Sequence, residues 1–220
     1  MSEQIIILAI VLFYAAVLLL AWKRPNLLGK SGENFVSRKL SRLDPRRYTT
    51  LNDLMLPSNG NTATTQIDQV VVSNFGIFCV ETKSHRGWIL GNAQQEYWTQ
   101  VIYRYRKKFY NPLRQNYAHV KAVEALLGSA FARVPVRGFV AFPRARKLKI
   151  SGTNTVDHAT DVVRKIAAYT QSVMTDDERK TIVGILLDTN IKDRKARKDH
   201  VKETRALRAS PQKWTSTAHK

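Results

Sequence analysis

Hydrophobic and polar positions divide the chain into an apolar N-terminal segment, a mixed central body and a polar C-terminal tail. Residues 5–22 form an uncharged apolar run of 18 residues. At ~1.5 Å of helix rise per residue, such a run is close to the length that crosses a bilayer core of ~30 Å. A cleaved signal peptide is the alternative, but no Lys or Arg precedes the run and no A-x-A-like site ends it. We therefore expect residues 1–23 to form a transmembrane anchor.

The charges beside this run predict its orientation. Lys23, Arg24 and Lys30 follow it, whereas Glu3 precedes it. Because positively charged flanking residues stay on the cytoplasmic side of a membrane, we expect the body in the cytoplasm and the N-terminus outside. The expected location is the inner (cytoplasmic) membrane, crossed once, with residues 24–30 as a linker.

Residues 31–190 alternate strand-like and helix-like patterns, which predicts one α/β domain. In the first of its helices, Val36, Leu40 and Leu43 share one face. The predicted strands are 48–56, 65–73, 76–83, 88–90, 97–105, 136–143 and 147–150, and the predicted helices are 31–43, 111–128, 159–171 and 175–188.

The chain is strongly basic. It carries 36 Lys or Arg against 17 Asp or Glu, a net charge of +19, so it should attract polyanions such as nucleic acid or anionic lipid headgroups. Residues 191–220 are polar and rich in Lys and Arg, and they form either a mobile or partly helical anion-binding arm or a solvated tail. The single cysteine, Cys79, excludes an intramolecular disulfide and any zinc site of several cysteines.

Two carboxylates occupy the adjacent strands on either side of the turn S-N-F-G. If Ser73 pairs with Gly76 across this turn, the same antiparallel register pairs Asp68 with Glu81. The two side chains would then face each other on one side of the sheet, with Cβ atoms roughly 5 Å apart. Lys83, two residues beyond Glu81, points to that side as well.

Facing carboxylates repel each other and are costly to desolvate. A shared proton, a cationic partner such as Lys83, or a bound divalent cation would each relieve the repulsion. Oxygen ligands of this kind suit Mg²⁺, with Mn²⁺ as a second candidate. The alternative is a structural ion pair between Glu81 and Lys83 beside an exposed Asp68.

The surroundings of this hairpin are basic and aromatic. From Lys83 to Lys149 there are 14 Lys and Arg against two acids. Such residues neutralise phosphates and stack on unpaired bases, although an amphipathic strand with a solvated basic face fits the same pattern. Gln115 and His119, four residues apart on the following helix, face the same way. The candidate nucleic-acid-binding residues are Arg104, Arg106, Lys107, Lys108, Arg114 and His119.

Together these segments resemble the nuclease-related domain, or NERD, family, which is similar to the PD-(D/E)xK, restriction-endonuclease-like superfamily. The resemblance runs from about Leu28 to Leu127 and rests on GKSGENFVSRKL, TQIDQVVVSNFGIFCVETKSHRGWILG, Trp98 and FYNPLRQNYAH. It implies a restriction-endonuclease-like α/β fold, a mixed sheet flanked by helices, preceded in this chain by one transmembrane helix.

The resemblance also implies roles for individual residues. Lys83 would position or activate the attacking water, and Thr82 would add its backbone carbonyl to the metal shell. From spacing alone, Glu33 is either a first-turn acid favoured by the helix dipole or a site residue, and the resemblance favours the second. The implied catalytic residues are Glu33, Asp68, Glu81, Lys83 and Gln115, and the implied metal ligands are Asp68, Glu81 and Thr82.

The apolar run and the resemblance together lead us to expect a membrane-anchored, Mg²⁺-dependent nuclease that hydrolyses phosphodiester bonds in nucleic acid, with DNA as the expected substrate. The metal would polarise a phosphoryl oxygen, lower the pKa of a bound water and offset charge in the transition state. The alternative is a non-catalytic, membrane-tethered adaptor that holds nucleic acid or anionic lipid. The basic excess fits both, whereas the complete set of Glu33, Asp68, Glu81 and Lys83 favours the enzyme.

Overall fold

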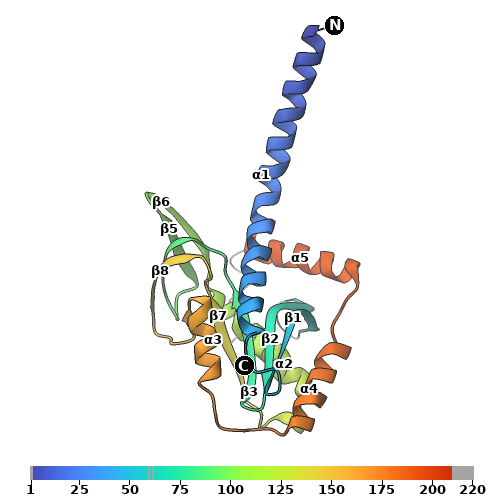
Figure 1. Cartoon of the computed structure of the whole chain (residues 1–220), viewed down its shortest axis with the longest axis vertical. Coiled ribbons are helices and arrows are strands. Elements are labelled where there is room, and N and C mark those ends of the chain that lie inside the picture. The colour runs from blue at the N-terminus through green and yellow to red at the C-terminus, as the bar shows by residue number, and fades with distance from the viewer. Residues whose placement is uncertain (1, 59, 61, 210–220) are drawn as a thin grey trace.

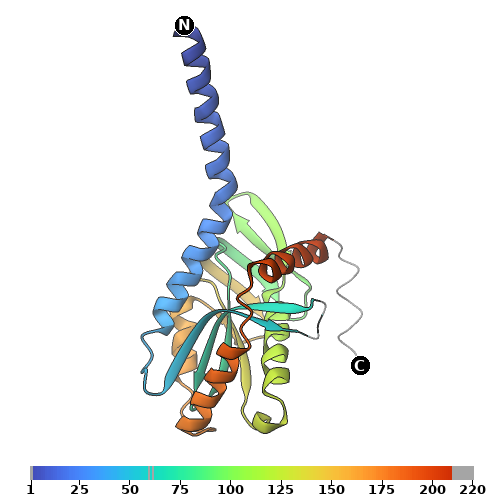
Figure 2. The same cartoon turned by 90° about the vertical axis from the view of Figure 1, so that its right-hand side faces the viewer.

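The computed structural model describes the backbone of residues 2–58, 60 and 62–209, with the side chains of these residues except at 2–6, 15–28, 205 and 207–209. The chain forms a body of two mixed β-sheets covered by helices, from which a long N-terminal helix projects (Figure 1 and Figure 2). The α/β class predicted from the sequence is confirmed. The strands divide between two mixed sheets, however, where a single sheet was expected.

Helix α1 runs without a break from Ser2 to Leu40. Residues 24–30 are therefore helical and continuous with both neighbours, where a linker was expected. Pro25 removes one backbone donor, but a helix can continue past such a position. Within the described residues, no helix combines the length and apolar character that crossing a membrane requires. The apolar run of residues 5–22 falls largely on side chains that lie outside the described set.

The first sheet has five strands in the order β1–β2–β3–β7–β9. Its antiparallel strands are β1 (Tyr48–Pro57), β2 (Thr64–Ser73) and β3 (Gly76–Thr82), and β7 (Val136–Ala141) and β9 (Val156–Asp157) extend it in parallel. Every residue of β3 is buried, as expected for a central strand that is covered on both faces. The first four of these strands were predicted to within a few residues, and the short β9 was not predicted.

The second sheet has the order β6–β5–β4–β8. Its strands are β4 (Gly87–Asn92), β5 (Tyr97–Ile102), β6 (Tyr105–Tyr110) and β8 (Ala145–Ser151). A single strand was predicted over residues 97–105, but Ile102 pairs with Tyr105 across a tight turn that separates β5 from β6. Tyr103 has a φ of 53° in this turn. Gly, Asn or Asp usually take that conformation, so the turn lacked its ordinary sequence signal.

Capping residues explain where two of the remaining helices begin. The Asn111 side chain accepts a hydrogen bond from the Leu113 N–H, and Pro112 stands at the first helical position. Thr175 and Glu178 form a reciprocal capping box. The remaining helices are α2 (Pro112–Leu127), the 3₁₀ turn η1 (Ser129–Phe131), α3 (Ala159–Ala167), α4 (Asp176–Asp188) and α5 (Arg194–Ala209), the last of which makes the basic tail partly helical.

Apolar side chains on both faces of the first sheet form the core. On one face, Val70 and Cys79 pack in a cluster with residues of α2 and α4. On the other face, Val71 and Phe78 pack with residues of α1 and α3. A third cluster around Trp98 joins the second sheet to the first. The end of β3 therefore lies between α1 and α2, and the candidate site is built there.

Candidate active site

The hairpin of β2 and β3 brings Asp68 close to the end of β3. Its register is the predicted one, with Ser73 opposite Gly76. Beyond the last paired residues, the Thr82 N–H donates a hydrogen bond of 2.7 Å to Asp68 Oδ2. Asp68 thus lies beside the residue that follows Glu81. Glu81 is 2% exposed, whereas Asp68 is half-buried.

Glu81 is held through both of its carboxylate oxygens. Lys83 Nζ donates to Glu81 Oε1 and, at 2.8 Å, to Gln115 Oε1. His119 Nε2 lies 3.0 Å from Glu81 Oε2, and His119 Nδ1 lies 2.7 Å from Thr65 Oγ1. When the Thr65 hydroxyl donates to Nδ1, the imidazole proton is on Nε2 and is donated to Glu81. The result is one connected, largely buried network.

Three acids share this region and disturb one another. Burial raises the pKa of Asp68 well above its usual value, and the charges of Glu81 and Glu33 raise it further. Burial and the Glu81 charge likewise raise the pKa of Glu33. Burial also acts to raise the pKa of Glu81, but the Lys83 charge and the His119 hydrogen bond outweigh it and lower that pKa to about 2. Lys83 and His119 therefore stabilise the ionised form of Glu81, whereas burial and the neighbouring acids disfavour the ionised forms of Asp68 and Glu33.

Asn116 fixes α2 against the first sheet. Its Nδ2 donates to two backbone carbonyls, one in β3 at 3.1 Å and one in β7 at 2.9 Å. Gly138 permits this approach, since a Cβ there would lie 2.8 Å from Asn116 Nδ2. Because Gln115 and His119 are on the same helix, this contact helps to hold both side chains against the end of β3.

Gly32 lets α1 approach the segment that follows β3. A Cβ at Gly32 would lie 1.8 Å from Ser84 Oγ. Ser84 Oγ also donates to the carbonyl of Gly29, at 3.4 Å. The close contact brings the next residue of α1, Glu33, within electrostatic reach of Glu81. Gly32 of the motif G-K-S-G-E therefore serves close packing between α1 and the segment after β3.

The sequence-predicted residues separate into two groups. Those gathered at the end of β3 are Glu33, Asp68, Glu81, Thr82, Lys83 and Gln115. His119 belongs with them, since the residue is only 3% exposed and its ring contacts Glu81, and a role for it in nucleic-acid binding stays a prediction. Spacing along α2 could not distinguish its buried face from its exposed face.

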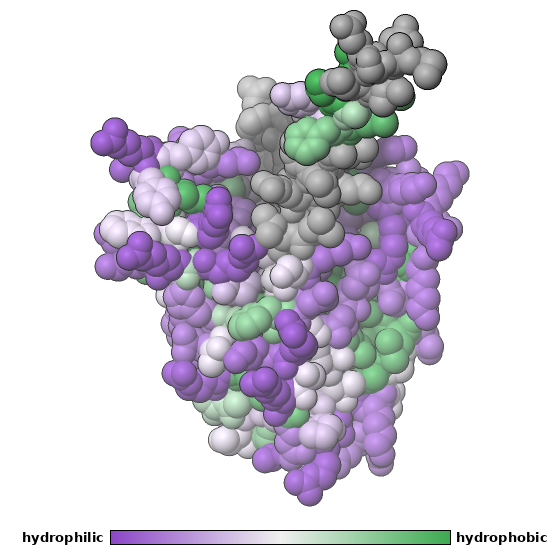
Figure 3. Space-filling view, turned by 45° about the horizontal axis from the view of Figure 1, so that its top comes forward, coloured by the Kyte–Doolittle hydropathy of each residue, from purple (hydrophilic) through white to green (hydrophobic). Residues whose placement is uncertain are grey.

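The other predicted nucleic-acid-binding residues are exposed. Arg104 lies in the β5–β6 turn, and Arg106, Lys107 and Lys108 lie on β6. Arg114, at the start of α2, donates to the Gln94 carbonyl at 3.0 Å. Hydrophilic side chains cover the projecting β5–β6 hairpin in the space-filling view (Figure 3).

His85 is a neighbour of the site that the sequence analysis did not single out. Its ring packs edge-on against Phe109, with 4.3 Å between ring centroids. Burial and the charges of Lys83 and Lys107 lower the pKa of His85 to about 4. A neutral imidazole therefore lies near Lys83 at neutral pH. Its position two residues after Lys83 was the available signal, but its burial depends on Phe109, which comes from a different strand.

Asp68 and Glu81 offer a donor set for a divalent cation. In the part of the chain that the structure describes, no group of three or more His, Cys, Asp and Glu side chains is placed to hold a metal ion. Mg²⁺ needs fewer, since it keeps several waters and takes one or two carboxylates. Each Glu81 oxygen accepts one hydrogen bond and keeps a second lone pair. The residues present therefore fit Mg²⁺ or Mn²⁺, whose charge would relieve the repulsion at Asp68.

Comparison with known proteins adds three findings. Residues 28–143 match the model of the NERD family, described as the nuclease-related domain. A Bacillus anthracis protein described as uncharacterized is 36% identical over 179 residues, which cover 81% of this chain and 84% of that protein. The crystal structure of protein AF1548, of unknown function, covers 83% of this chain and 100% of its own at 12% identity, with a TM-score of 0.30. A TM-score this low supports no statement about the fold.

Proposed function

Because this chain belongs to the nuclease-related domain family, we propose that it hydrolyses phosphodiester bonds in nucleic acid, with DNA as the expected substrate. The proposal is carried by one observation, which is the gathering of Glu33, Asp68, Glu81 and Lys83 around the end of β3. Repelling acids with shifted pKa values, next to a lysine, are typical of sites that act on a charged substrate.

A divalent cation belongs to this proposal. Asp68, Glu81 and the backbone carbonyl of Thr82 would hold Mg²⁺, or Mn²⁺ in its place. When bound, the ion would supply Lewis acidity and positive charge at the phosphoryl group. The hydrogen bond from the Thr82 N–H to Asp68 supports this ligand set, because it links the two strands that carry the carboxylates.

The side chains of the site would each contribute to hydrolysis. Lys83 holds a positive charge against Glu81 and Gln115, and it would stabilise the negative charge that grows on the phosphoryl oxygens. Glu33 has a raised pKa, which brings it closer to neutrality and suits a group that accepts a proton from the attacking water. His119 and Thr65 would keep Glu81 ionised and correctly oriented.

The exposed basic residues would bind the substrate backbone. Arg106, Lys107 and Lys108 lie on β6 at the edge of the second sheet. Arg104 lies in the turn before β6, and Arg114 lies at the start of the neighbouring helix. Lys107 acts electrostatically on His85, as does Lys83, which supports a continuous positive path from this edge to the site.

We also propose that the N-terminal run anchors the chain in the inner (cytoplasmic) membrane. The charges at Lys23, Arg24 and Lys30 support a single crossing with the N-terminus outside and the body in the cytoplasm. The large apolar side chains of α1 between Ile7 and Tyr14 are 50–66% exposed, which supports a lipid environment for this helix. Nuclease activity would then be confined to nucleic acid that reaches the membrane.

Cleavage by the purified full chain in detergent tests the catalytic proposal. The assay would use labelled duplex DNA, single-stranded DNA and RNA, each with Mg²⁺ and with EDTA. We expect Mg²⁺-dependent cleavage by the wild-type chain and by the control variant Glu124→Gln, which changes an exposed acid paired with Lys121. Glu81→Gln should not cleave. Salt-sensitive binding without cleavage by the wild-type chain would favour the non-catalytic adaptor.

A further inference from the structure

The outer face of the second sheet presents a tryptophan among basic side chains. In one row across the strands, Trp88 lies between Lys147 and Val101, and Val101 in turn pairs with Arg106. Residues paired across neighbouring strands point to the same face of a sheet. Trp88 is 40% exposed. The next row on this face runs from Lys149 through Leu90 and Thr99 to Lys108.

The strands of this sheet carry positively charged side chains and no negatively charged ones. Strands β4, β5, β6 and β8 contain no Asp or Glu. Their cations are all exposed and are Arg106, Lys107, Lys108, Arg146, Lys147 and Lys149. None of the six takes part in an ion pair among the described residues. Four of them, Arg106, Lys108, Lys147 and Lys149, share the face of Trp88. A face with this charge attracts a polyanion such as the phosphate backbone.

The fold itself does not account for the outward position of Trp88. The opposite face of the same sheet supplies Ile89 and Trp98 to a buried cluster, so the core needs nothing from the outer face. Around Trp88 the structure places two ammonium groups instead, with Lys147 Nζ 5.6 Å and Lys149 Nζ 4.8 Å from the ring centroid. These lysines are flexible, and a phosphate could draw them off the ring.

We propose that this face is a binding platform for an unpaired stretch of nucleic acid, in which a base stacks on Trp88 and the flanking phosphates bind Lys147, Lys149, Arg106 and Lys108. The inference rests on the proposed function and adds to it the form of nucleic acid that the chain binds. An exposed aromatic ring inside a basic surface is the combination that binds single strands, because every base offers a π-face. A duplex keeps those faces stacked inside its helix.

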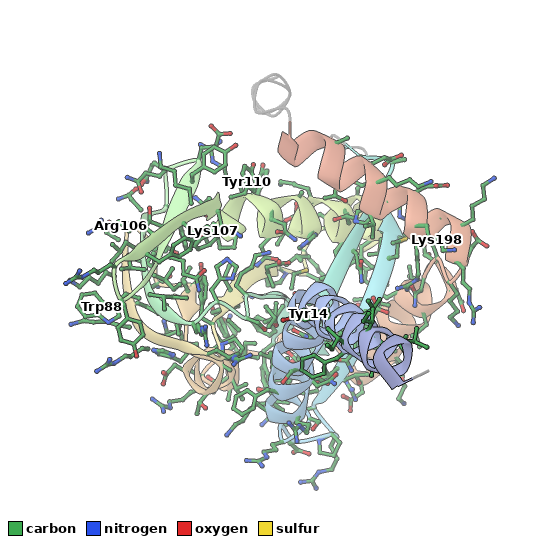
Figure 4. All side chains as sticks on the ribbon, turned by 90° about the horizontal axis from the view of Figure 1, so that it is seen from above. Tyr14, Trp88, Arg106, Lys107, Tyr110 and Lys198 are labelled. Carbon is green, nitrogen blue, oxygen red and sulfur yellow. The ribbon has the colours of Figure 1, made fainter. Side chains whose placement is uncertain are left out.

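The platform lies on one flank of the body, and β6 links it to the candidate active site. Seen from above, Trp88 and Arg106 lie at the outer rim of the body, on the flank away from α1 (Figure 4). In the side view the second sheet lies toward the end of the body from which α1 projects (Figure 1), so anionic lipid is the rival ligand that the test has to separate from nucleic acid. The alternation along β6 links the platform to the site. Arg106 and Lys108 share the face of Trp88, whereas Lys107 acts on His85 near Lys83.

Binding by the full chain in EDTA tests the platform separately from cleavage. Fluorescence anisotropy would compare a short labelled oligothymidylate with a duplex of equal length. Trp88→Ala should weaken oligothymidylate binding roughly 5- to 150-fold, from the ~1–3 kcal/mol that one stacked base contributes. Trp88→Phe should retain most of the affinity, and duplex binding should change little.

Tyr117→Ala is the matched control. Tyr117 is an exposed aromatic residue, 62% exposed, that also has a lysine over its ring, Lys121 at 5.5 Å. Because Glu124 pairs with that lysine, the site offers no free charge for phosphate, and binding should be unchanged. Equal affinities of Trp88→Ala and wild-type chains for the single strand would overturn the platform. So would an equal loss for duplex, or a loss confined to vesicles of anionic lipid.

The outcomes for the platform and for the nuclease are distinguishable. A chain that binds single strands through Trp88 but never cleaves with Mg²⁺ supports the platform and contradicts the nuclease. A chain that cleaves, and whose single-strand binding is indifferent to Trp88, supports the nuclease and contradicts the platform.

Discussion

His119 Nε2 lies 3.0 Å from Glu81 Oε2, although 38 residues separate them in the chain. The two side chains are almost fully buried, and the Thr65 hydroxyl contacts the other imidazole nitrogen. A carboxylate buried in this way is orientated by its neighbours and stays ionised because they donate to it. The contact therefore ties the middle of α2 to the proposed metal ligand at the end of β3.

Removing this donor should weaken both the fold and the site. His119→Ala leaves one oxygen of Glu81 without its donor, so we expect a loss of about 1–3 kcal/mol in the free energy of unfolding. Thr65→Val should cost less, because it removes only the group that selects the imidazole tautomer. Urea unfolding would show whether His119→Ala loses more free energy of unfolding than Thr65→Val does. Equal stability of His119→Ala and the wild-type chain would show that the contact is not maintained in solution.

Asp68 and Glu81 should respond oppositely to loss of charge when no metal is present. The raised pKa of Asp68 means that folding disfavours its ionised form, so Asp68→Asn should raise the melting temperature at neutral pH in EDTA. The lowered pKa of Glu81 means that folding favours its charge, so Glu81→Gln should lower the melting temperature. Each substitution should change the free energy of unfolding by an amount on the order of 1–3 kcal/mol.

The same pair predicts a response to pH and to metal. The advantage of Asp68→Asn should begin to shrink as the pH falls below the raised pKa of Asp68, and it should vanish only near the ordinary pKa of 3.8, where the unfolded wild-type chain is protonated as well. Mg²⁺ should raise the melting temperature of the wild-type chain by mass action, and that of Asp68→Asn less. An equal Mg²⁺-induced rise in melting temperature in both chains would show that Asp68 does not bind the metal.

His85 should make the folded chain sensitive to mild acid. Its pKa falls from 6.5 to about 4 on folding, so the unfolded chain takes up a proton at a higher pH than the folded chain does. Stability should therefore decrease as the pH falls from 6.5 towards 4, by at most ~1.4 kcal/mol per pH unit from this residue. His85→Gln should remove that part of the slope. Urea unfolding of both chains across this pH range gives the dependence of the free energy of unfolding on pH. If that dependence is the same in His85→Gln and in the wild-type chain, other groups cause it.

Gly32 and Gly184 provide a matched comparison of two helical glycines. A Cβ at Gly32 would meet Ser84 Oγ at 1.8 Å, whereas a Cβ at Gly184 meets nothing within 4 Å. Gly32→Ala should therefore displace α1 from the site, lowering both the melting temperature and any cleavage. Gly184→Ala should be neutral or should stabilise by up to ~1 kcal/mol through helix propensity. Similar effects of both substitutions would mean that α1 does not pack tightly there.

Local signals allowed the hairpin of the site to be predicted, but not its surroundings. The turn residues between Ser73 and Gly76 are enough to set the register, and the register predicts which side chains share a face. The burial of His119 depends on how α2 sits on the sheet, which Asn116 and Gly138 determine across long sequence separations. Spacing could therefore predict that Gln115 and His119 face the same way, but not how deeply His119 is buried.

Two other features of the structure also differ from what the sequence predicted, because each depends on contacts that local sequence patterns do not show. The turn between β5 and β6 uses Tyr103 at a positive φ, so no glycine or asparagine marked it and one long strand was predicted. The basic face around Trp88 comes from four strands, one of which, β8, lies far along the chain. The sequence showed that region to be basic, but only the sheet order shows which cations surround the tryptophan.

We propose that a divalent cation bound by Asp68 and Glu81 makes this family member a nuclease. The most direct test is a crystal structure of the full chain grown with Mn²⁺ and a nucleic acid that resists hydrolysis, with anomalous diffraction measured to locate the metal. The account predicts an anomalous peak within ~2.0–2.6 Å of a carboxylate oxygen from each of the two residues. A preparation that cleaves with Mn²⁺ yet shows no peak between Asp68 and Glu81, or a peak held by other side chains, would contradict it.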